Sequence, residues 1–174
     1  DYEELRLIVV HMGGGISVGA HRYGKVIDVN QAIGGEGAFS PQRSGTLPSI
    51  DLVDLCFSGK YSREEVNKML IGEGGLSAYL GTNSAIEVEK RIREGDKKAE
   101  LIYGAMAYQV AKMVGEMYTV LECEADYILI TGGIAYDKWF VGKLRSRIGK
   151  IAAIAIYPGE NELESLAMNG LNVI

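Results

Sequence analysis

Residues 5–15 read Leu5-Arg6-Leu7-Ile8-Val9-Val10-His11-Met12-Gly13-Gly14-Gly15, an apolar run that ends in three consecutive glycines. A run of apolar and β-branched residues that stops at glycines favours a buried strand. Consecutive glycines let backbone N–H groups approach an anionic ligand without interference from Cβ atoms. The stretch therefore predicts a strand that ends in a turn suited to phosphate, although an ordinary glycine turn without a ligand has the same pattern.

A second glycine turn lies more than a hundred residues further along the chain. Residues 127–131 form another apolar run, and Gly132-Gly133-Ile134 follows it, before a short loop and a helical pattern. Glycines at this place allow a flat base to lie close to the backbone, and a helix N-terminus favours a nearby phosphate. Together the two turns predict one nucleotide held at two places, and with it a phosphoryl-transfer enzyme.

The order of the predicted elements indicates the fold. The expected strands cover residues 5–12, 16–21, 25–29, 127–131 and 152–157, and the expected helices cover residues 50–57, 62–70, 84–93, 97–121, 138–148 and 161–169. Three meander strands followed by α/β crossovers predict an α/β fold with a mixed five-stranded sheet and helices on both faces. The right-handed crossover rule places the second glycine turn at the carboxyl end of its strand, where ligands bind in open α/β sheets.

Local patterns predict how the helices begin and which side they bury. Ser49 and Asn83 are expected to cap the helices that follow them, and Ser62-Arg63-Glu64-Glu65 is a capping box. The long helix carries apolar residues at helical spacing that are expected to face the core: Leu101, Ala105, Tyr108, Ala111, Met113, Met117 and Val120. Cys56 and Cys123 fit no metal or redox spacing and lie in apolar stretches, which predicts buried thiols.

Composition excludes several classes of protein. The 174 residues are 47% hydrophobic and carry a net charge of −5, which argues against nonspecific binding to nucleic acid because such binding needs a basic face. No apolar run approaches the length of about 20 residues that spans a bilayer. The acidic start Asp1-Tyr2-Glu3-Glu4 is unlike a signal peptide, so a cytoplasmic protein is expected.

Three further segments carry candidate chemistry. Residues 31–48 form a long loop rich in Gly, Ser and Pro, in which Arg43 is either a surface residue or a partner for a transferring phosphoryl group. Ser17 offers a hydroxyl donor beside the first turn, and Tyr136 after the second either stacks on a base or packs in the core. Near the end of the chain, Glu160 and Glu162 either ligate Mg²⁺ or complement a helix dipole.

These segments together are similar to one family. The motifs that carry the resemblance are residues 11–21, 24–30, 35–41, 43–48, 131–134 and 158–162. In this combination and order the chain resembles the carboxyl-terminal half of the butyrate kinases, in the acetate kinase family of the actin-like ATPase superfamily. The resemblance covers essentially all 174 residues and implies a ribonuclease H-like domain that binds nucleotide.

The resemblance implies a role for each matching residue. Arg43 corresponds to the catalytic arginine that stabilises the transferring phosphoryl group, and Glu160 and Glu162 fall where the family has its magnesium-linked glutamate. The nucleotide-binding positions that the resemblance implies are His11, Gly13, Gly14, Gly15, Thr82, Asn83, Gly132, Gly133, Ile134, Ala135, Tyr136 and Asp137. The hydroxyl of Ser17 is added to them as a further donor. The implied cofactors are ATP or ADP with Mg²⁺, and the implied reaction is transfer of the γ-phosphate to butanoate or a branched analogue.

The resemblance also implies partners. Family members are about twice this length, so an amino-terminal domain with further catalytic residues is expected to be missing, and the chain alone is expected to be inactive. The intact protein is expected to be a homo-oligomer, with no nucleic-acid or membrane partner. Two other interpretations remain open, namely another actin-like ATPase such as a sugar kinase, and a non-catalytic nucleotide-binding or oligomerisation module.

Overall fold

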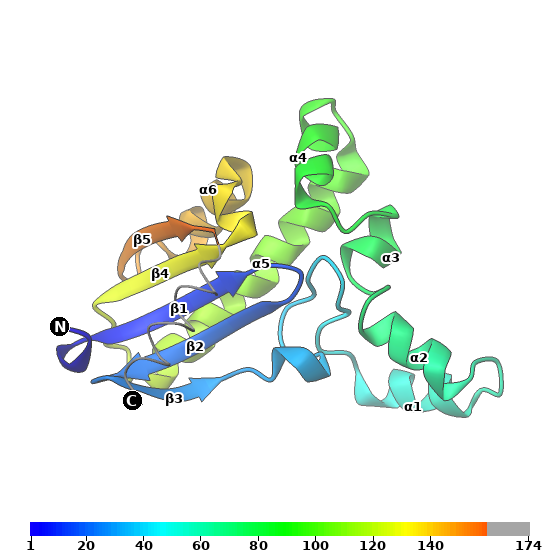
Figure 1. Cartoon of the computed structure of the whole chain (residues 1–174), viewed down its shortest axis with the longest axis horizontal. Coiled ribbons are helices and arrows are strands. Elements are labelled where there is room, and N and C mark those ends of the chain that lie inside the picture. Colours follow the sequence, from blue (N-terminus) through cyan, green and yellow to red (C-terminus); the bar gives the residue numbers. More distant parts are fainter. Residues whose placement is uncertain (160–174) are drawn as a thin grey trace, which may run out of the picture.

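The fold is built on one mixed five-stranded sheet, as predicted. We describe a computed structural model of the chain over residues 1–159. The strands are β1 (Arg6–Met12), β2 (Ile16–Arg22), β3 (Lys25–Val29), β4 (Tyr127–Gly132) and β5 (Ala153–Pro158). Their order in the sheet is β3-β2-β1-β4-β5 (Figure 1). The first three strands form the antiparallel meander, whereas β4 runs parallel to both β1 and β5.

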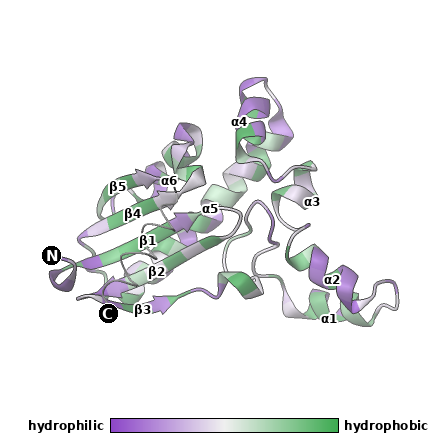
Figure 2. Cartoon of the chain, in the orientation of Figure 1, coloured by the Kyte–Doolittle hydropathy of each residue, from purple (hydrophilic) through white to green (hydrophobic). Residues whose placement is uncertain are grey.

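One face of this sheet packs in the hydrophobic core. The register aligns Val10 of β1 with Val18 of β2 and with Ile130 of β4, and all three are fully buried. Residues two apart on a strand share a face, so Ile8 and Met12 extend the same apolar surface. Hydrophobic residues accordingly concentrate in the central strands (Figure 2).

Two helices cover this face. They are α5 (Lys97–Val120) and α6 (Lys138–Ile148), and their buried side chains belong to the same core as the strands (Figure 1). Both helices were expected, and both match the predicted ranges within one residue. The further helix expected over residues 161–169 lies outside the described part of the chain.

The prediction of the buried side of α5 is wrong at two of its seven positions. Leu101 and Tyr108 were expected in the core, but they are 70% and 49% exposed. Met113 and Met117 are buried as predicted, and the other three positions are partly buried and pack against the core. The helix is apolar around most of its circumference, so helical spacing alone does not separate the exposed positions from the fully buried ones, which are Ala99, Tyr103, Met106, Ala107, Val110, Met113, Val114 and Met117.

Four shorter helices extend beyond the sheet (Figure 1). They are α1 (Ser49–Phe57), α2 (Arg63–Leu70), α3 (Leu76–Leu80) and α4 (Ala85–Arg93). The capping box of Ser62 and Glu65 is confirmed. The cap at Asn83 is wrong, because Ser84 accepts the hydrogen bond from the Glu87 N–H instead. Ser49 is the first residue of α1 rather than its cap, and Pro48 occupies the cap position.

The prediction of buried thiols is also wrong, because both cysteines are exposed. Cys56 lies on α1, which buries none of its residues despite their apolar character. Cys123 lies just beyond the end of α5, in a turn where its φ is 61°. No helix within residues 1–159 is long and apolar enough to cross a membrane.

A buried polar contact joins α5 to the start of α6. Asp137 caps α6 by accepting hydrogen bonds from the Trp139 and Phe140 N–H groups, and it also accepts one from the Tyr103 hydroxyl at 3.0 Å. The Tyr103 ring stacks on Trp139, with centroids 5.6 Å apart. Burial, and then the nearby charge of Asp137, raise the pKa of Tyr103 well above its usual range. Tyr103 therefore stays protonated and acts as a donor.

The contact between Tyr103 and Asp137 makes stability depend on alkaline pH. Tyrosine in the unfolded chain loses its proton near pH of about 10, whereas folded Tyr103 holds it to higher pH. Its contribution is therefore complete below that pH and is lost as the pH rises further. We expect Tyr103→Phe to lower the free energy of unfolding by about 1–3 kcal/mol at neutral pH, and the difference from the unmodified chain to shrink above pH of about 10.

Urea unfolding across this pH range measures both effects. Tyr108→Phe is the matched control, because Tyr108 lies on the same helix but is half exposed and keeps its ring against Arg147. A difference between Tyr103→Phe and the unmodified chain that stayed constant with pH would contradict the account.

Candidate active site

Polar side chains form a row across four strands of the sheet. The register aligns His11 of β1 with Ser17 of β2 and Thr131 of β4, and it aligns Thr131 with Tyr157 of β5. His11 lies between the core residues Val10 and Met12, so alternation along the strand places this row on the face opposite α5 and α6. The row lies at the carboxyl ends of β1 and β4, so its polar groups stand beside both glycine turns.

The two glycine turns adjoin each other. Gly132 has a φ of 91°, and a Cβ atom on it would collide with the backbone of Met12 at the end of β1. Gly132 also exchanges a pair of backbone hydrogen bonds with Gly159 after β5. The second turn therefore lies at the carboxyl end of β4, as expected, and it adjoins the end of β1, for which Gly132 is needed.

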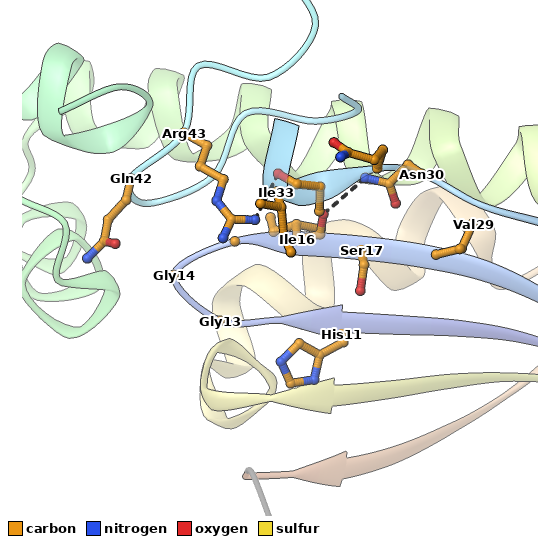
Figure 3. A pocket seen from close by; sticks show the side chains of 13 residues that line it. His11, Gly13, Gly14, Ile16, Ser17, Val29, Asn30, Ile33, Gln42 and Arg43 are labelled. Carbon is orange, nitrogen blue, oxygen red and sulfur yellow. Dashed lines mark hydrogen bonds between the residues drawn. The ribbon is translucent and has the colours of Figure 1, made fainter. Parts of the chain in front are cut away.

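The first turn opens into a cavity of about 800 Å³, a size typical of sites for small molecules. Among the predicted residues it is lined by His11, Gly13, Gly14, Gly15, Ser17 and Arg43 (Figure 3). Residues to which the sequence analysis assigned no role complete the lining: Ile16, Val29, Asn30, Gln31, Ala32, Ile33 and Gln42. The motif around Arg43 contains Gln42, so proximity to that arginine was the available signal for this residue.

Arg43 lies in the cavity rather than on the outer surface. Its guanidinium packs over Gly15, where a Cβ atom would collide with it. Nη1 donates a hydrogen bond to the Ala32 carbonyl at 2.8 Å, so the group is held in one orientation while part of it faces the cavity (Figure 3). Such a fixed, planar donor suits an anion with several oxygens.

Ser40 joins the arginine loop to the glycine turn, and the sequence analysis assigned it no role. Its buried hydroxyl donates to the Gly14 carbonyl at 2.7 Å and accepts the Arg43 N–H at 3.1 Å. Its backbone N–H donates to the Arg43 carbonyl, and its carbonyl accepts from Leu76. One buried residue therefore sets the position of both the turn and the arginine.

Asn30 closes the opposite side of the cavity. Its Oδ1 accepts the Val18 N–H at 2.8 Å, and its Nδ2 donates to the carbonyls of Ile16 and Glu36. These bonds tie the end of β3 to β2. The amide therefore shapes the cavity wall, and the available signal in the sequence was its place at the end of the motif 24–30.

The second turn continues into the 3₁₀ helix η3 (Gly133–Tyr136). Gly133 and Tyr136 are exposed, and a Cβ atom on Gly133 would meet no atom within 4 Å. Ile134, Ala135 and Asp137 are buried, and Asp137 is the cap of α6 described above. Only Gly133 and Tyr136 of this segment therefore present a surface that a ligand could touch without rearrangement.

None of the predicted residues 132–137 lines the cavity, and the remaining candidate residues also lie apart from it. Thr82 donates to Glu87 at 2.7 Å and accepts the Ser84 N–H at the start of α4, next to the exposed Asn83. Neither residue lines the cavity. Glu160 and Glu162 lie outside the described residues. Within residues 1–159, no group of three or more His, Cys, Asp or Glu side chains is placed to hold a metal ion.

Comparison with known proteins confirms the resemblance noted in the sequence. A sequence model of the acetokinase family matches residues 1–171. Over all 174 residues the chain is 55% identical to Butyrate kinase 2 from Clostridium acetobutylicum, and it covers 49% of that protein. The chain thus spans about half the length of this curated relative.

Solved structures agree on the fold. A propionate kinase from Francisella tularensis is similar with a TM-score of 0.78 and 26% identity, over 90% of this chain and 47% of that one. An acetate kinase from Porphyromonas gingivalis is similar with a TM-score of 0.86 and 21% identity, over 98% of this chain and 50% of that one. The predicted actin-like ATPase fold is therefore confirmed.

The role of Ser40 leads to a prediction about the site. Ser40→Ala removes the donor to Gly14 and the acceptor for Arg43, so we expect the free energy of unfolding to fall by about 1–3 kcal/mol. We also expect faster hydrogen exchange in the turn at Gly13–Gly15, measured by mass spectrometry. Ser77→Ala is the control, because that hydroxyl donates to Pro41 of the same loop but does not touch the turn. Equal exchange at the turn in both variants would contradict the linking role.

Proposed function

The chain belongs to the acetokinase family, and from this premise we propose that it is the nucleotide-binding half of a short-chain carboxylate kinase. The reaction proposed is transfer of the γ-phosphate of ATP to butanoate, which forms butanoyl phosphate and ADP. The observation that carries the proposal is the guanidinium of Arg43, held over the Gly13–Gly15 turn inside the cavity. The name of the relative from Clostridium acetobutylicum, Butyrate kinase 2, supports the choice of acid.

The phosphates are proposed to lie at the first turn. The Gly13 N–H already donates to the Gly15 carbonyl, so the N–H groups of Gly14 and Gly15 are the proposed donors to phosphate oxygens. Ser17 and His11 stand in the polar row beside this turn. We add Thr131, which lies in the same row, to the residues proposed to surround the phosphates.

Adenosine is proposed to lie along the second turn. The exposed Gly133 leaves room for a flat base, and Tyr136 stands 69% exposed three residues later. Because the two turns adjoin through Gly132 and Met12, one nucleotide is long enough to touch both. The buried residues Ile134, Ala135 and Asp137 are proposed to hold this segment in place without touching the base. Thr82 and Asn83, at the start of α4, are proposed as further contacts to the nucleotide.

Arg43 is proposed to act on the phosphoryl group in transit. A carboxylate oxygen attacks the γ-phosphorus, the bond from that phosphorus to the bridging oxygen breaks, and ADP leaves with that oxygen. The carboxylate is already a nucleophile, so catalysis needs positioning and charge stabilisation rather than a base. Arg43 supplies positive charge beside the equatorial oxygens, where negative charge develops in the transition state. Ser40 accepts the Arg43 N–H and so holds the backbone of this arginine in place.

Mg²⁺ is proposed as the metal, with Glu160 or Glu162 among its ligands. When bound, Mg²⁺ would neutralise charge on the phosphate oxygens. The described residues form no cluster of three metal-binding side chains.

The partners are proposed from the family. We propose that the chain works with an amino-terminal domain, which supplies the rest of the catalytic groups and of the acid site. Coverage of about half of each relative supports this. A homo-oligomer located in the cytoplasm is proposed for the intact protein.

A kinase assay tests the function. With this chain joined to its amino-terminal half, we expect acyl phosphate, trapped as hydroxamate, from butanoate and ATP. Arg43→Ala should lower kcat by about 10²–10³, as loss of one preorganised donor does elsewhere. Arg93→Ala is the control, since Arg93 is an exposed residue of α4 paired with Glu89.

Two results would contradict the proposal. If no acid from acetate to pentanoate is phosphorylated, the chain is not part of a carboxylate kinase. If Arg43→Ala behaves like Arg93→Ala, the arginine is not a catalytic residue, and another actin-like kinase becomes the better interpretation.

A further inference from the structure

Three side-chain amides line the cavity, and one of them makes no hydrogen bond to any residue within the range 1–159. Asn30 uses its amide on backbone groups, as described above, and the Gln31 side chain accepts the Gly34 N–H. Gln42 is exposed, and only its backbone groups bond to other described residues. Its side-chain amide therefore keeps two donors and one acceptor for a ligand in the cavity.

The backbone of Gln42 is held at both of its polar groups. Its N–H donates to the Gly14 carbonyl at 3.3 Å, and its carbonyl accepts the Gly72 N–H at 2.7 Å. The first bond ties the residue to the tip of the glycine turn, and the second ties it to the segment that follows α2. A ligand that binds Gln42 therefore has only the side-chain torsions to order, which keeps the entropic cost of the contact small.

Gln42 and Arg43 approach the glycine turn from different sides. Arg43 lies in a short antiparallel bridge, and successive side chains of an extended segment alternate in direction. The guanidinium of Arg43 packs over Gly15, as described above. A Cβ atom on Gly14 would instead lie 3.4 Å from Oε1 and 3.9 Å from Nε2 of Gln42. Figure 3 shows the two side chains diverging from the loop at the tip of the turn.

The charge of the lining favours an anion beside Gln42. Among the described residues, the lining includes Arg43 and neither an aspartate nor a glutamate. Gly14, whose N–H is already proposed as a donor to phosphate, is the residue beside which the Gln42 amide lies. An N–H that donates to a charged oxygen makes a stronger hydrogen bond than one between neutral groups. A phosphate oxygen at the tip of the turn would thus meet two neutral donors, one from the backbone and one from Gln42.

We propose that Nε2 of Gln42 donates a hydrogen bond to a phosphate of the nucleotide that is not transferred, while Arg43 serves the phosphoryl group in transit. This inference rests on the proposed function. The Gln42 contact is made before, during and after the transfer, and such uniform binding lowers KM without raising kcat. Arg43 instead meets charge that develops in the transition state, so its loss lowers kcat.

Two substitutions test the contact in this chain joined to its amino-terminal half. Calorimetry gives the Kd for Mg²⁺-ADP, and the hydroxamate assay gives kcat and the KM for ATP. We expect Gln42→Ala to raise both the Kd and the KM by about 10-fold, the cost of one hydrogen bond to a charged group, with kcat unchanged. Gln42→Glu should raise them further, because a carboxylate of the same shape repels phosphate. Asn67→Ala is the control, since Asn67 is an exposed amide on α2 that does not line the cavity.

The other possible results overturn the inference and separate it from the function on which it rests. If Gln42→Ala behaves like Asn67→Ala, the amide is an ordinary surface group while the kinase function stands. If Gln42→Glu binds ADP as tightly as the unmodified protein, the residue donates no bond to phosphate. A lower kcat with an unchanged Kd would place Gln42 on the transferred group instead. If the unmodified protein neither binds ADP nor phosphorylates an acid, the proposed function itself fails, and the inference with it.

Discussion

The parallel pairing of β1 with β4 positions residues on both faces of the sheet. It sets Val10 beside Ile130 in the core and His11 beside Thr131 on the opposite face, so a single register positions both the core and the polar row. It also brings Gly132 against the end of β1 so closely that no side chain fits between them. Two turns that are distant in the sequence thereby lie next to each other.

The arginine loop is built onto that surface by backbone contacts and one hydroxyl. Ser40 bonds to Gly14 on one side and to Arg43 on the other, and it is fully buried. A buried hydrogen bond is costly to leave unmade, so the loop has little freedom to place the guanidinium elsewhere. The missing side chain at Gly15 then supplies the space in which the guanidinium rests. The geometry of the candidate site thus depends on the same packing that fixes the turn between β1 and β2.

Much of the fold follows from local sequence signals. Apolar runs bounded by glycines predicted all five strands, and the Ser62 capping box was predicted and found. The buried side of α5 was predictable only in part, because the helix is apolar around most of its circumference and spacing alone did not show that Leu101 and Tyr108 are exposed. Exposure of Cys56 was missed for a related reason: apolar sequence predicts burial, whereas α1 stands apart from the core.

The candidate site was predictable only where glycines and charge marked it. The turn at Gly13–Gly15 and Arg43 were identified from sequence and lie in one cavity. Ser40 was missed because its importance comes from its contact with Gly14, which is far away in the chain and which no local pattern records. Asp137 was counted among the nucleotide-binding residues, although its carboxylate is occupied as the cap of α6.

Amide chemical shifts of this chain during titration with Mg²⁺-ATP test whether one nucleotide spans both glycine turns. If it does, Gly14, Gly15 and Gly133 shift together and saturate with one shared Kd. Gly133→Val should weaken that binding at both turns, whereas Gly142→Val, at an equally open position on α6, should not. Saturation at one turn alone, or no saturation up to millimolar ATP, would contradict the account.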